Sequence, residues 1–158
     1  MTKEQANRTQ QEASENPDLM IENQVCFSLY SAANAIIRAY RPMLKSLDLT
    51  YPQYLVMIVL WQYDGINVKA LGNKLHLDSG TLTPLLKRLE SKQLLSRVRG
   101  EKDERVREIY LTEQGQKLKA QAEKVPNQML CKSKLPIDEL LTLKTGCDKI
   151  YENLEEGE

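Results

Sequence analysis

The chain has 158 residues, and its hydrophobic fraction of 41% is enough to build a core, which excludes a wholly disordered protein. Its 22 basic residues balance 22 acidic ones, so net charge alone does not indicate a nucleic-acid partner. The first eighteen residues are polar and contain no apolar run long enough for a signal peptide or a membrane span. We therefore expect a cytoplasmic protein that has no membrane partner.

The three cysteines, Cys26, Cys131 and Cys147, are odd in number and widely spaced, unlike a secreted disulfide framework, so we expect reduced thiols. His76 is the only histidine and no CxxC pair occurs, so a structural zinc site would need ligands far apart in sequence. No redox-enzyme motif is present either. These absences lead us to expect no cofactor and no enzymatic activity.

Charge is distributed unevenly along the chain. Residues 67–112 contain ten Lys or Arg against six Asp or Glu, a net charge of +4. Residues 136–158 contain two against seven, a net charge of −5. A basic middle suits contact with DNA, but two solvated faces would give the same pattern, and both interpretations stay open at this point.

Apolar residues at spacings of three and four predict a helix from about residue 18 to residue 41, which Pro42 should end or kink. Its apolar face comprises Cys26, Leu29, Tyr30, Ala33, Ile37 and Tyr40. A second helix should begin at residues 50–52, with proline near its start, and end at residues 64–65. Residues 54–61 within it are so apolar that they must be buried.

The next segment has a helix-turn-helix pattern. The apolar positions of a short third helix are Val68, Leu71 and Leu75, and those of a fourth are Leu82, Leu85, Leu86 and Leu89. Residues 76–78 form the turn between them. Pro84 lacks an amide hydrogen and is tolerated in a first turn, which predicts that the fourth helix begins between Asp78 and Thr81.

Two short runs, residues 95–99 and 105–111, are joined by a five-residue connection containing Gly100, and this pattern predicts a β-hairpin. The hairpin would be the wing of a winged helix. Thr112 is expected to cap a long helix that continues to about Val125.

A last amphipathic helix is expected after Pro136. Its apolar face comprises Leu140, Leu143, Cys147, Ile150, Tyr151 and Leu154. The apolar faces of the two terminal helices need a covering surface, which a second copy of the chain would supply. Folding back onto their own subunit is the alternative.

The expected fold class is mainly α with a small β-hairpin wing, a winged helix-turn-helix that dimerises through its N- and C-terminal helices. Four segments follow: a polar disordered tail at 1–18, a dimerisation and sensing helix at 19–48, the DNA-binding winged helix-turn-helix at 49–112, and C-terminal dimerisation helices at 113–158.

Double-stranded DNA is the expected partner of the fourth helix and the wing. Small hydroxyl residues near the helix start would bond base edges in the major groove, and the Lys-Arg pair further along would bond phosphates. At the hairpin, a lysine and an arginine would reach the minor groove, with an aspartate holding the guanidinium. The candidate DNA-binding residues are Ser79, Thr81, Thr83, Lys87, Arg88, Lys102, Asp103 and Arg105. An ordinary helical hairpin with a charged face is the alternative.

The segment LDSGTLTPLLKRLE at 77–90, with DER at 103–105, resembles the MarR family of winged-helix regulators. TYPQY at 50–54 and NQVCF at 23–27 are similar to its organic hydroperoxide resistance branch. The resemblance covers roughly residues 19–154. It implies a homodimer that represses a peroxidase gene by binding a pseudo-palindromic operator, with an organic hydroperoxide as the oxidising signal.

The resemblance also implies a reactive cysteine at Cys26, with hydroxyls of Tyr40 and Tyr51 near the sulfur, where such donors stabilise a thiolate. Cys26 and Tyr40 are about 21 Å apart along one helix at about 1.5 Å per residue, so Tyr40 would act across the dimer. Tyr30, at i+4 from Cys26, would line the pocket from the same subunit. Some members of the branch use a single cysteine with an external thiol, and others carry a late resolving cysteine, which corresponds to Cys131, so both routes stay open.

Other interpretations remain open from the residues alone. Cys26 would be an inert core thiol in most proteins, the tyrosines would be packing residues, and Cys147 is interpreted as packing. A regulator of this fold could instead bind a phenolic or other small ligand in the dimer cleft without thiol chemistry. A thiol peroxidase and a structural interaction module are the alternatives from other functional classes.

Overall fold

The computed structural model describes residues 16–100 and 106–156, and the chain divides into two compact units between Tyr40 and Arg41. Two 3-10 turns, η1 (Pro17–Leu19) and η2 (Ile21–Asn23), precede helix α2 (Val25–Lys45). The helix therefore begins later than expected. The reason is local, because side-chain amides in this segment bond back to carbonyl oxygens of η1 and favour tight turns.

Pro42 does not end the first helix, because α2 continues for three residues beyond it to Lys45; the alternative, a kink at Pro42, stays a prediction. Proline removes one intrahelical hydrogen bond. Leu44, two residues after the proline, is only 1% exposed, and Leu47 is also buried. Burial of these leucines offsets the lost hydrogen bond and keeps the last turn of α2 helical.

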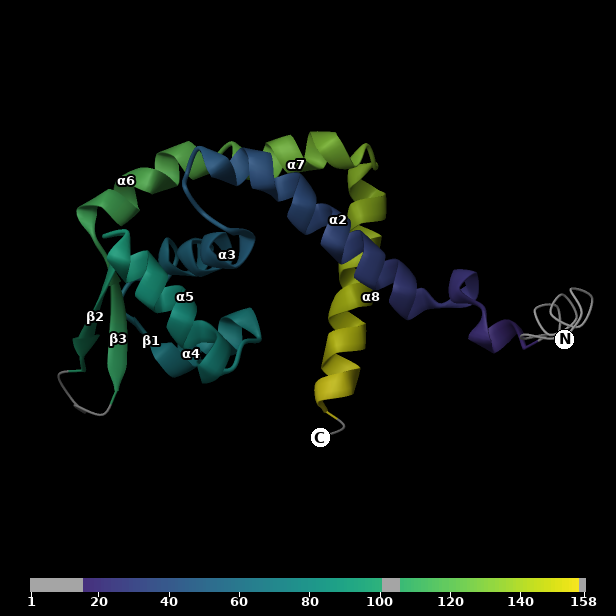
Figure 1. The fold of residues 1–158 in the computed structure, drawn as a ribbon, viewed down its shortest axis with the longest axis horizontal. Helices are drawn as coiled ribbons and strands as arrows, with labels where there is room; N and C mark the ends of the chain where they lie inside the picture. The colour runs from purple at the N-terminus through teal and green to yellow at the C-terminus, as the bar shows by residue number, and fades with distance from the viewer. Residues whose placement is uncertain (1–15, 101–105, 157–158) are drawn as a thin grey trace, which may run out of the picture. The chain divides into compact units, whose positions relative to one another are not determined.

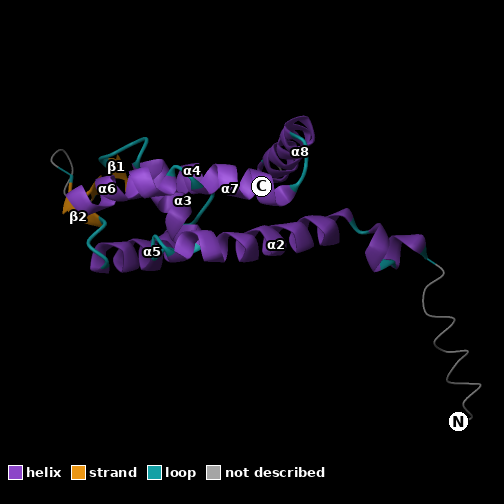
Figure 2. Cartoon of the chain, turned by 90° about the horizontal axis from the view of Figure 1, so that it is seen from above, coloured by secondary structure: helices purple, strands orange, loops and turns teal. Residues whose placement is uncertain are grey.

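The second unit has the element order of a winged helix-turn-helix, which confirms the expected mainly α fold with a small wing (Figure 1). Its three strands gather at one end of the helices α3 to α6 (Figure 2). The elements are α3 (Tyr51–Leu60), β1 (Ile66–Asn67), α4 (Val68–Leu75), α5 (Ser79–Ser91), β2 (Leu95–Arg99), β3 (Arg107–Leu111), α6 (Glu113–Ala122), α7 (Val125–Ser133) and α8 (Ile137–Glu155).

Helix α3 begins as expected, with a capping box. The Thr50 side chain accepts a hydrogen bond from the Gln53 backbone amide, and the Gln53 side chain accepts one from the Thr50 backbone amide. It ends at Leu60, four residues earlier than the sequence suggested. The Asp64 carboxylate accepts hydrogen bonds from its neighbour Gly65 and from the Leu111 amide at 2.7 Å, which holds residues 61–65 in a turn against β3.

The wing is part of a three-stranded antiparallel sheet of order β1-β3-β2. Leu95 pairs with Leu111 and Arg99 with Arg107, so the hairpin is in the expected place, although β3 begins at Arg107. Strand β1 was not predicted. With only two residues it is too short to show the alternation that identifies a strand.

The core of this unit is built from leucines at helical spacing. Leu82, Leu86 and Leu89 of α5 are at most 1% exposed, which confirms three of the four positions predicted for the stripe of the fourth helix, and Leu85 is half-buried. The start of α5 at Ser79 is also as predicted, but Pro84 is its sixth residue and lies beyond the first turn. The Asp78 cap fixes the helix start independently of the proline, so the lost hydrogen bond is tolerated.

Thr112 caps α6 by accepting from the Gly115 amide at 3.0 Å, as expected, but α6 ends at Ala122. Because Cys131 stands between Pro126 and Pro136, the sequence predicts an interrupted helix around it; this prediction is wrong, because α7 is helical throughout. Pro126 stands at the start of α7, where an amide hydrogen would be unpaired in any case, so it begins a helix instead of breaking one. A left-handed residue, Lys134, ends α7.

Gly115 occupies a site with no room for a side chain. A Cβ at this position would lie 2.0 Å from the Leu94 carbonyl oxygen, a backbone atom that has little freedom to move. We therefore expect Gly115→Ala to lower the free energy of unfolding by about 2 kcal/mol, despite the better helix propensity of alanine. Urea titration at a fixed protein concentration measures this.

Gly146→Ala is the matched control, because a Cβ there meets nothing within 4 Å in the described chain. We expect this helical substitution to leave stability unchanged or to raise it by up to about 1 kcal/mol. Equal loss in the two variants would contradict the tight contact at Gly115.

Candidate nucleic-acid interface and cysteine positions

The start of α5 is fixed by Asp78. Its carboxylate accepts from the Thr81 amide and, through its other oxygen, from the Thr81 hydroxyl, both at 2.8 Å. The hydrogen bond from the Thr81 amide, followed by that from its hydroxyl, holds the pKa of Asp78 below its ordinary value. The carboxylate therefore stays ionised at neutral pH at the positive end of the helix, where a negative charge is favourable.

The predicted base-reading residues lie together at this end of α5. Ser79 and Thr81 are exposed, and Thr83 is half-buried and donates its hydroxyl to the Ser79 carbonyl at 2.7 Å. Lys87 and Arg88 are exposed further along the helix. These five candidates therefore lie on the side of α5 that faces away from the leucine core.

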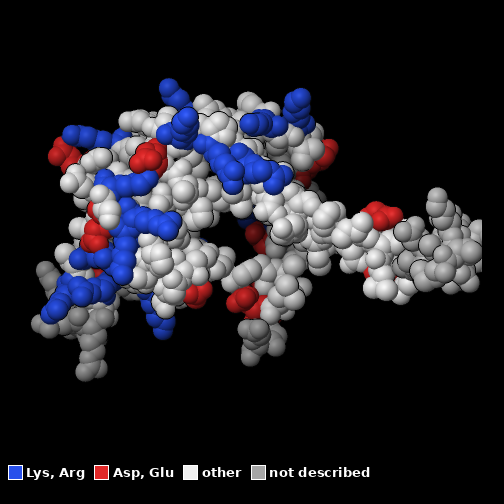
Figure 3. Space-filling model, viewed as in Figure 1, with Lys and Arg blue, Asp and Glu red and all other residues white. Residues whose placement is uncertain are grey.

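Basic side chains gather over α5 and the wing strands on the face shown in Figure 3. The predicted wing residues Lys102, Asp103 and Arg105 lie outside the described residues. Within the described strands, Arg99 and Arg107 are exposed and opposite each other. These two arginines were not among the predicted DNA-binding residues, although both lie in the predicted hairpin, where basic side chains were expected to contact DNA.

An ion pair joins helix α5 to strand β2 of the wing. The Arg97 guanidinium of β2 donates to the Glu90 carboxylate of α5, with Nε at 2.9 Å from Oε2, and the Arg97 amide donates to the other oxygen. Arg97 holds the pKa of Glu90 below its ordinary value. This pair could not be predicted from the sequence, because its two residues lie seven positions apart on different elements.

A groove of about 650 Å³ lies between α4, the start of α5 and the wing strands. Leu77, Leu82 and Val106 are among its apolar residues, and Lys69 and Arg107 are among its cations. The groove places hydroxyl, cationic and apolar groups side by side, which is the mixture of contacts that a sugar-phosphate backbone and base edges require.

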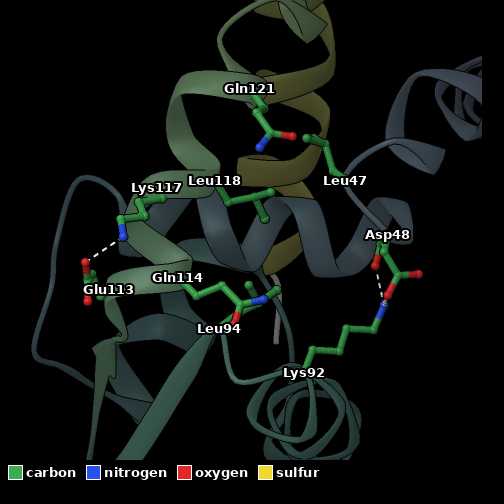
Figure 4. Close-up of a pocket in the computed structure, with 9 residues that line it drawn as sticks. All are labelled: Leu47, Asp48, Lys92, Leu94, Glu113, Gln114, Lys117, Leu118 and Gln121. Atoms are coloured by element: carbon green, nitrogen blue, oxygen red, sulfur yellow. Dashed lines mark hydrogen bonds and ion pairs between the residues drawn. The ribbon is translucent and has the colours of Figure 1, made fainter.

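A second pocket, of about 420 Å³, lies between the loop after α2, the end of α5 and α6 (Figure 4). Its two lysines are already paired, Lys92 with Asp48 at 2.9 Å and Lys117 with Glu113 at 2.6 Å. Because both cations have carboxylate partners, this pocket offers no unpaired positive charge to a phenolate or carboxylate ligand.

The candidate sensing residues are distributed over both units. Cys26 is the second residue of α2 and is exposed, and Tyr30 lies one turn later on the same helix, 68% exposed. Tyr40 is half-buried near the end of the first unit. Tyr51 begins α3 in the second unit, where burial raises the pKa of its hydroxyl and keeps it a hydrogen-bond donor.

Cys131 lies in α7 and Cys147 in α8, and both are exposed. Cys147 was expected to be packed, but no residue of α8 is buried in the single chain. The three cysteines are free thiols here. Across residues 16–100 and 106–156, no group of three or more His, Cys, Asp or Glu could hold a metal ion, and no helix is long and apolar enough to cross a membrane.

The Glu90–Arg97 pair should make stability depend on pH. Since the native pKa of Glu90 is depressed, the pair stabilises the fold above the ordinary value of 4.5, and its contribution is lost as the pH falls through the lower native pKa. We expect Glu90→Gln to lower the free energy of unfolding by about 0.5–1 kcal/mol at pH 7, because the pair is partly exposed to solvent. Urea titrations between pH 7 and pH 3 should show this difference shrinking towards low pH.

Glu123→Gln, at an exposed position after α6, is the control and should match wild type at every pH. A Glu90→Gln deficit that persists unchanged at pH 3 would show that the loss does not arise from the ionised pair.

Known proteins that are similar to this chain agree with the fold described above. A family model described as transcriptional regulator SarA/Rot matches residues 38–122. The organic hydroperoxide resistance transcriptional regulator of Bacillus subtilis (strain 168) is 43% identical over 138 residues, which cover 87% of this chain and 94% of the relative.

Two solved structures superpose on this chain along most of its length. Reduced AbfR bound to DNA superposes with a TM-score of 0.72 at 33% identity, covering 85% of this chain and 95% of that one. Disulfide-formed AbfR superposes with a TM-score of 0.57 at 30% identity, covering 96% and 97%. The family model and the Bacillus relative are described as transcriptional regulators, and reduced AbfR is bound to DNA. The chain therefore belongs to the MarR/SarA-type family of winged-helix, DNA-binding transcriptional regulators.

Proposed function

We propose that this regulator is a dimeric repressor that releases its operator when an organic hydroperoxide oxidises Cys26. The observation that carries the proposal is the 43% identity to an organic hydroperoxide resistance regulator over 87% of the chain. The exposure of Cys26 near the start of α2 supports it, because a sensing thiol must be accessible to its oxidant.

The proposed chemistry has two steps. The Cys26 thiolate attacks the terminal oxygen of the hydroperoxide, so that an S–O bond forms and the O–O bond breaks. The alkoxide leaves and takes a proton from solvent to become the alcohol, and Cys26 becomes a sulfenic acid. The Cys131 thiol of the other subunit then attacks this sulfur, so that a disulfide forms and water leaves. An apolar pocket would favour organic hydroperoxides over hydrogen peroxide, because the organic tail gains burial.

Tyrosine hydroxyls would support the thiolate. Tyr51 remains a hydrogen-bond donor because burial raises the pKa of its hydroxyl. In the proposed dimer, Tyr51 and Tyr40 donate to Cys26 from the other subunit, and Tyr30 forms part of the pocket on the same helix as the cysteine.

The homodimer is proposed from the unpartnered apolar faces of the terminal helices. In α8, Leu141 is 56%, Leu143 48% and Leu154 70% exposed, and α2 also exposes large apolar residues at its start. A run of such side chains on two helices is unusual for a monomeric surface. Two recognition helices related by a two-fold axis would then bind a pseudo-palindromic operator in double-stranded DNA, with half-sites about one helical turn apart.

Within that operator, Ser79, Thr81 and Thr83 are proposed to contact base edges, and Lys87 and Arg88 the phosphates. The wing residues Lys102, Asp103 and Arg105 are proposed to reach the minor groove. The alternative is a regulator controlled by a phenolic or other small ligand bound in the dimer cleft, without thiol chemistry.

Substitutions in α5 should separate base contacts from phosphate contacts. Thr81→Ala should alter the preference at one operator base pair by about 1–3 kcal/mol, whereas Lys87→Ala should weaken all sequences alike and reduce the salt slope by about 1. Thr81→Ser keeps the hydroxyl and is the control. Fluorescence anisotropy with operator variants at several salt concentrations measures both effects, and a uniform loss for Thr81→Ala would contradict its role.

Cysteine variants test the redox mechanism. Cys26→Ser should bind the operator normally and keep binding after treatment with cumene hydroperoxide, since serine forms no sulfenic acid. On a non-reducing gel, oxidised wild type should run as a covalent dimer, and Cys26→Ser and Cys131→Ser should run as monomers.

Cys147→Ser is the matched control and should still cross-link. Cross-linking that survives in Cys131→Ser but disappears in Cys147→Ser would reassign the resolving thiol. Release of Cys26→Ser by peroxide would refute Cys26 as the sensor, and release by a phenolic compound without oxidant would favour the ligand-controlled alternative.

A further inference from the structure

The C-terminal part of α8 lies against the turn between α4 and α5. The rings of His76, in that turn, and Tyr151, on α8, have centroids 3.9 Å apart with an interplanar angle of 43°. Tyr151 and Glu155 of α8 line one side of a hollow, and residues of α4 and the turn line the other. This is a contact between the proposed dimerisation helix and the helix-turn-helix.

The turn that Tyr151 contacts is tightly constrained. His76 adopts a left-handed conformation with φ of 54°, and the Leu77 amide donates to the Gly72 carbonyl at 3.0 Å. A Cβ at Gly72 would lie 2.7 Å from the Leu77 carbonyl oxygen. Asp78, which caps α5, follows two residues after His76. A force on the His76 ring therefore acts on the start of α5 through a short segment with little freedom.

The apolar stripe of α8 is only partly covered within the chain. Tyr151 and Glu155 lie one turn apart, and desolvation, the larger cause, together with the Glu155 carboxylate beside its hydroxyl raises the pKa of Tyr151. Leu143, Ile150 and Leu154 belong to the same stripe as Tyr151, and all three are exposed. The edge of the stripe at Tyr151 thus contacts the helix-turn-helix, and the rest of the stripe is left for the second subunit.

We propose that the His76–Tyr151 contact couples the dimer interface to the recognition helix, so that a displacement of α8 changes the position of α5. His76 and Tyr151 are positioning residues that do not touch DNA or the oxidant. The inference rests on the proposed function for its signal, because disulfide formation by the neighbouring helix α7 is what would displace α8. Packed elements of this kind switch between discrete arrangements.

Tyr151→Ala removes the ring, and His76→Asn removes the imidazole while keeping a residue that tolerates positive φ. Lys149→Ala, on the opposite side of α8 from Tyr151, is the matched control. In the reduced dimers, hydrogen exchange of the Leu77 and Leu82 amides should become about three- to tenfold faster in both test variants and unchanged in Lys149→Ala, as expected for loss of one aromatic contact.

Operator affinity should then be measured before and after oxidation. We expect the fold-loss of affinity on oxidation to fall by about three- to tenfold in Tyr151→Ala and His76→Asn, although both still form the covalent dimer on a gel. Lys149→Ala should respond like wild type. A merely structural role would weaken binding in both redox states without changing their ratio.

The experiment gives different results for failure of the redox function and for failure of the His76–Tyr151 coupling. If wild type keeps its operator after oxidation, the redox function is wrong, and the exchange rates still decide whether α8 holds the turn. If wild type responds and Tyr151→Ala shows the same affinity ratio and the same exchange rates as Lys149→Ala, the coupling contact is refuted.

Discussion

The winged helix-turn-helix depends on the close contact where α6 meets the end of α5. The Leu94 carbonyl occupies the space that a side chain at residue 115 would need, and the Trp61 indole donates to the Gly115 carbonyl at 2.9 Å. The Thr112 hydroxyl donates to the Gln93 carbonyl beside them. Because helices α3, α5 and α6 and strand β2 all meet at this point, the orientation of the DNA-binding elements follows from one glycine and two side-chain donors.

Much of this fold could be predicted from the sequence, because leucines at helical spacing and a Gly-containing hairpin connection are strong local signals. The cap of α6 by Thr112 and the start of α5 were predictable for the same reason. What failed were the expected helix breaks at Pro42 and Pro126 and the expected place of Pro84 in the first turn of α5, although the helix start inferred from Pro84 was correct. Pro42, Pro84 and Pro126 each stand in a helix, because burial of neighbouring leucines, a capping carboxylate or a position in the first turn decides the outcome.

The candidate site was predictable in part. Exposed hydroxyl and basic residues on α5 follow from the leucine stripe, since whatever the stripe excludes must face outward. The Glu90–Arg97 pair and the His76–Tyr151 contact could not be predicted. Each joins two different elements, and how those elements pack against each other is decided only when the chain folds. Local patterns do not encode such long-range geometry.

At the start of α5, the hydroxyl hydrogens of Thr81 and Thr83 already form hydrogen bonds within the protein. Thr81 gives its hydrogen to Asp78 and Thr83 gives its own to a backbone carbonyl, so both hydroxyl oxygens present lone pairs outward. If these oxygens face base edges, as proposed, they accept from the exocyclic amino groups of cytosine and adenine. The carbonyl oxygens of guanine and thymine would meet acceptors instead of donors, so the capping of one helix limits which bases it tolerates.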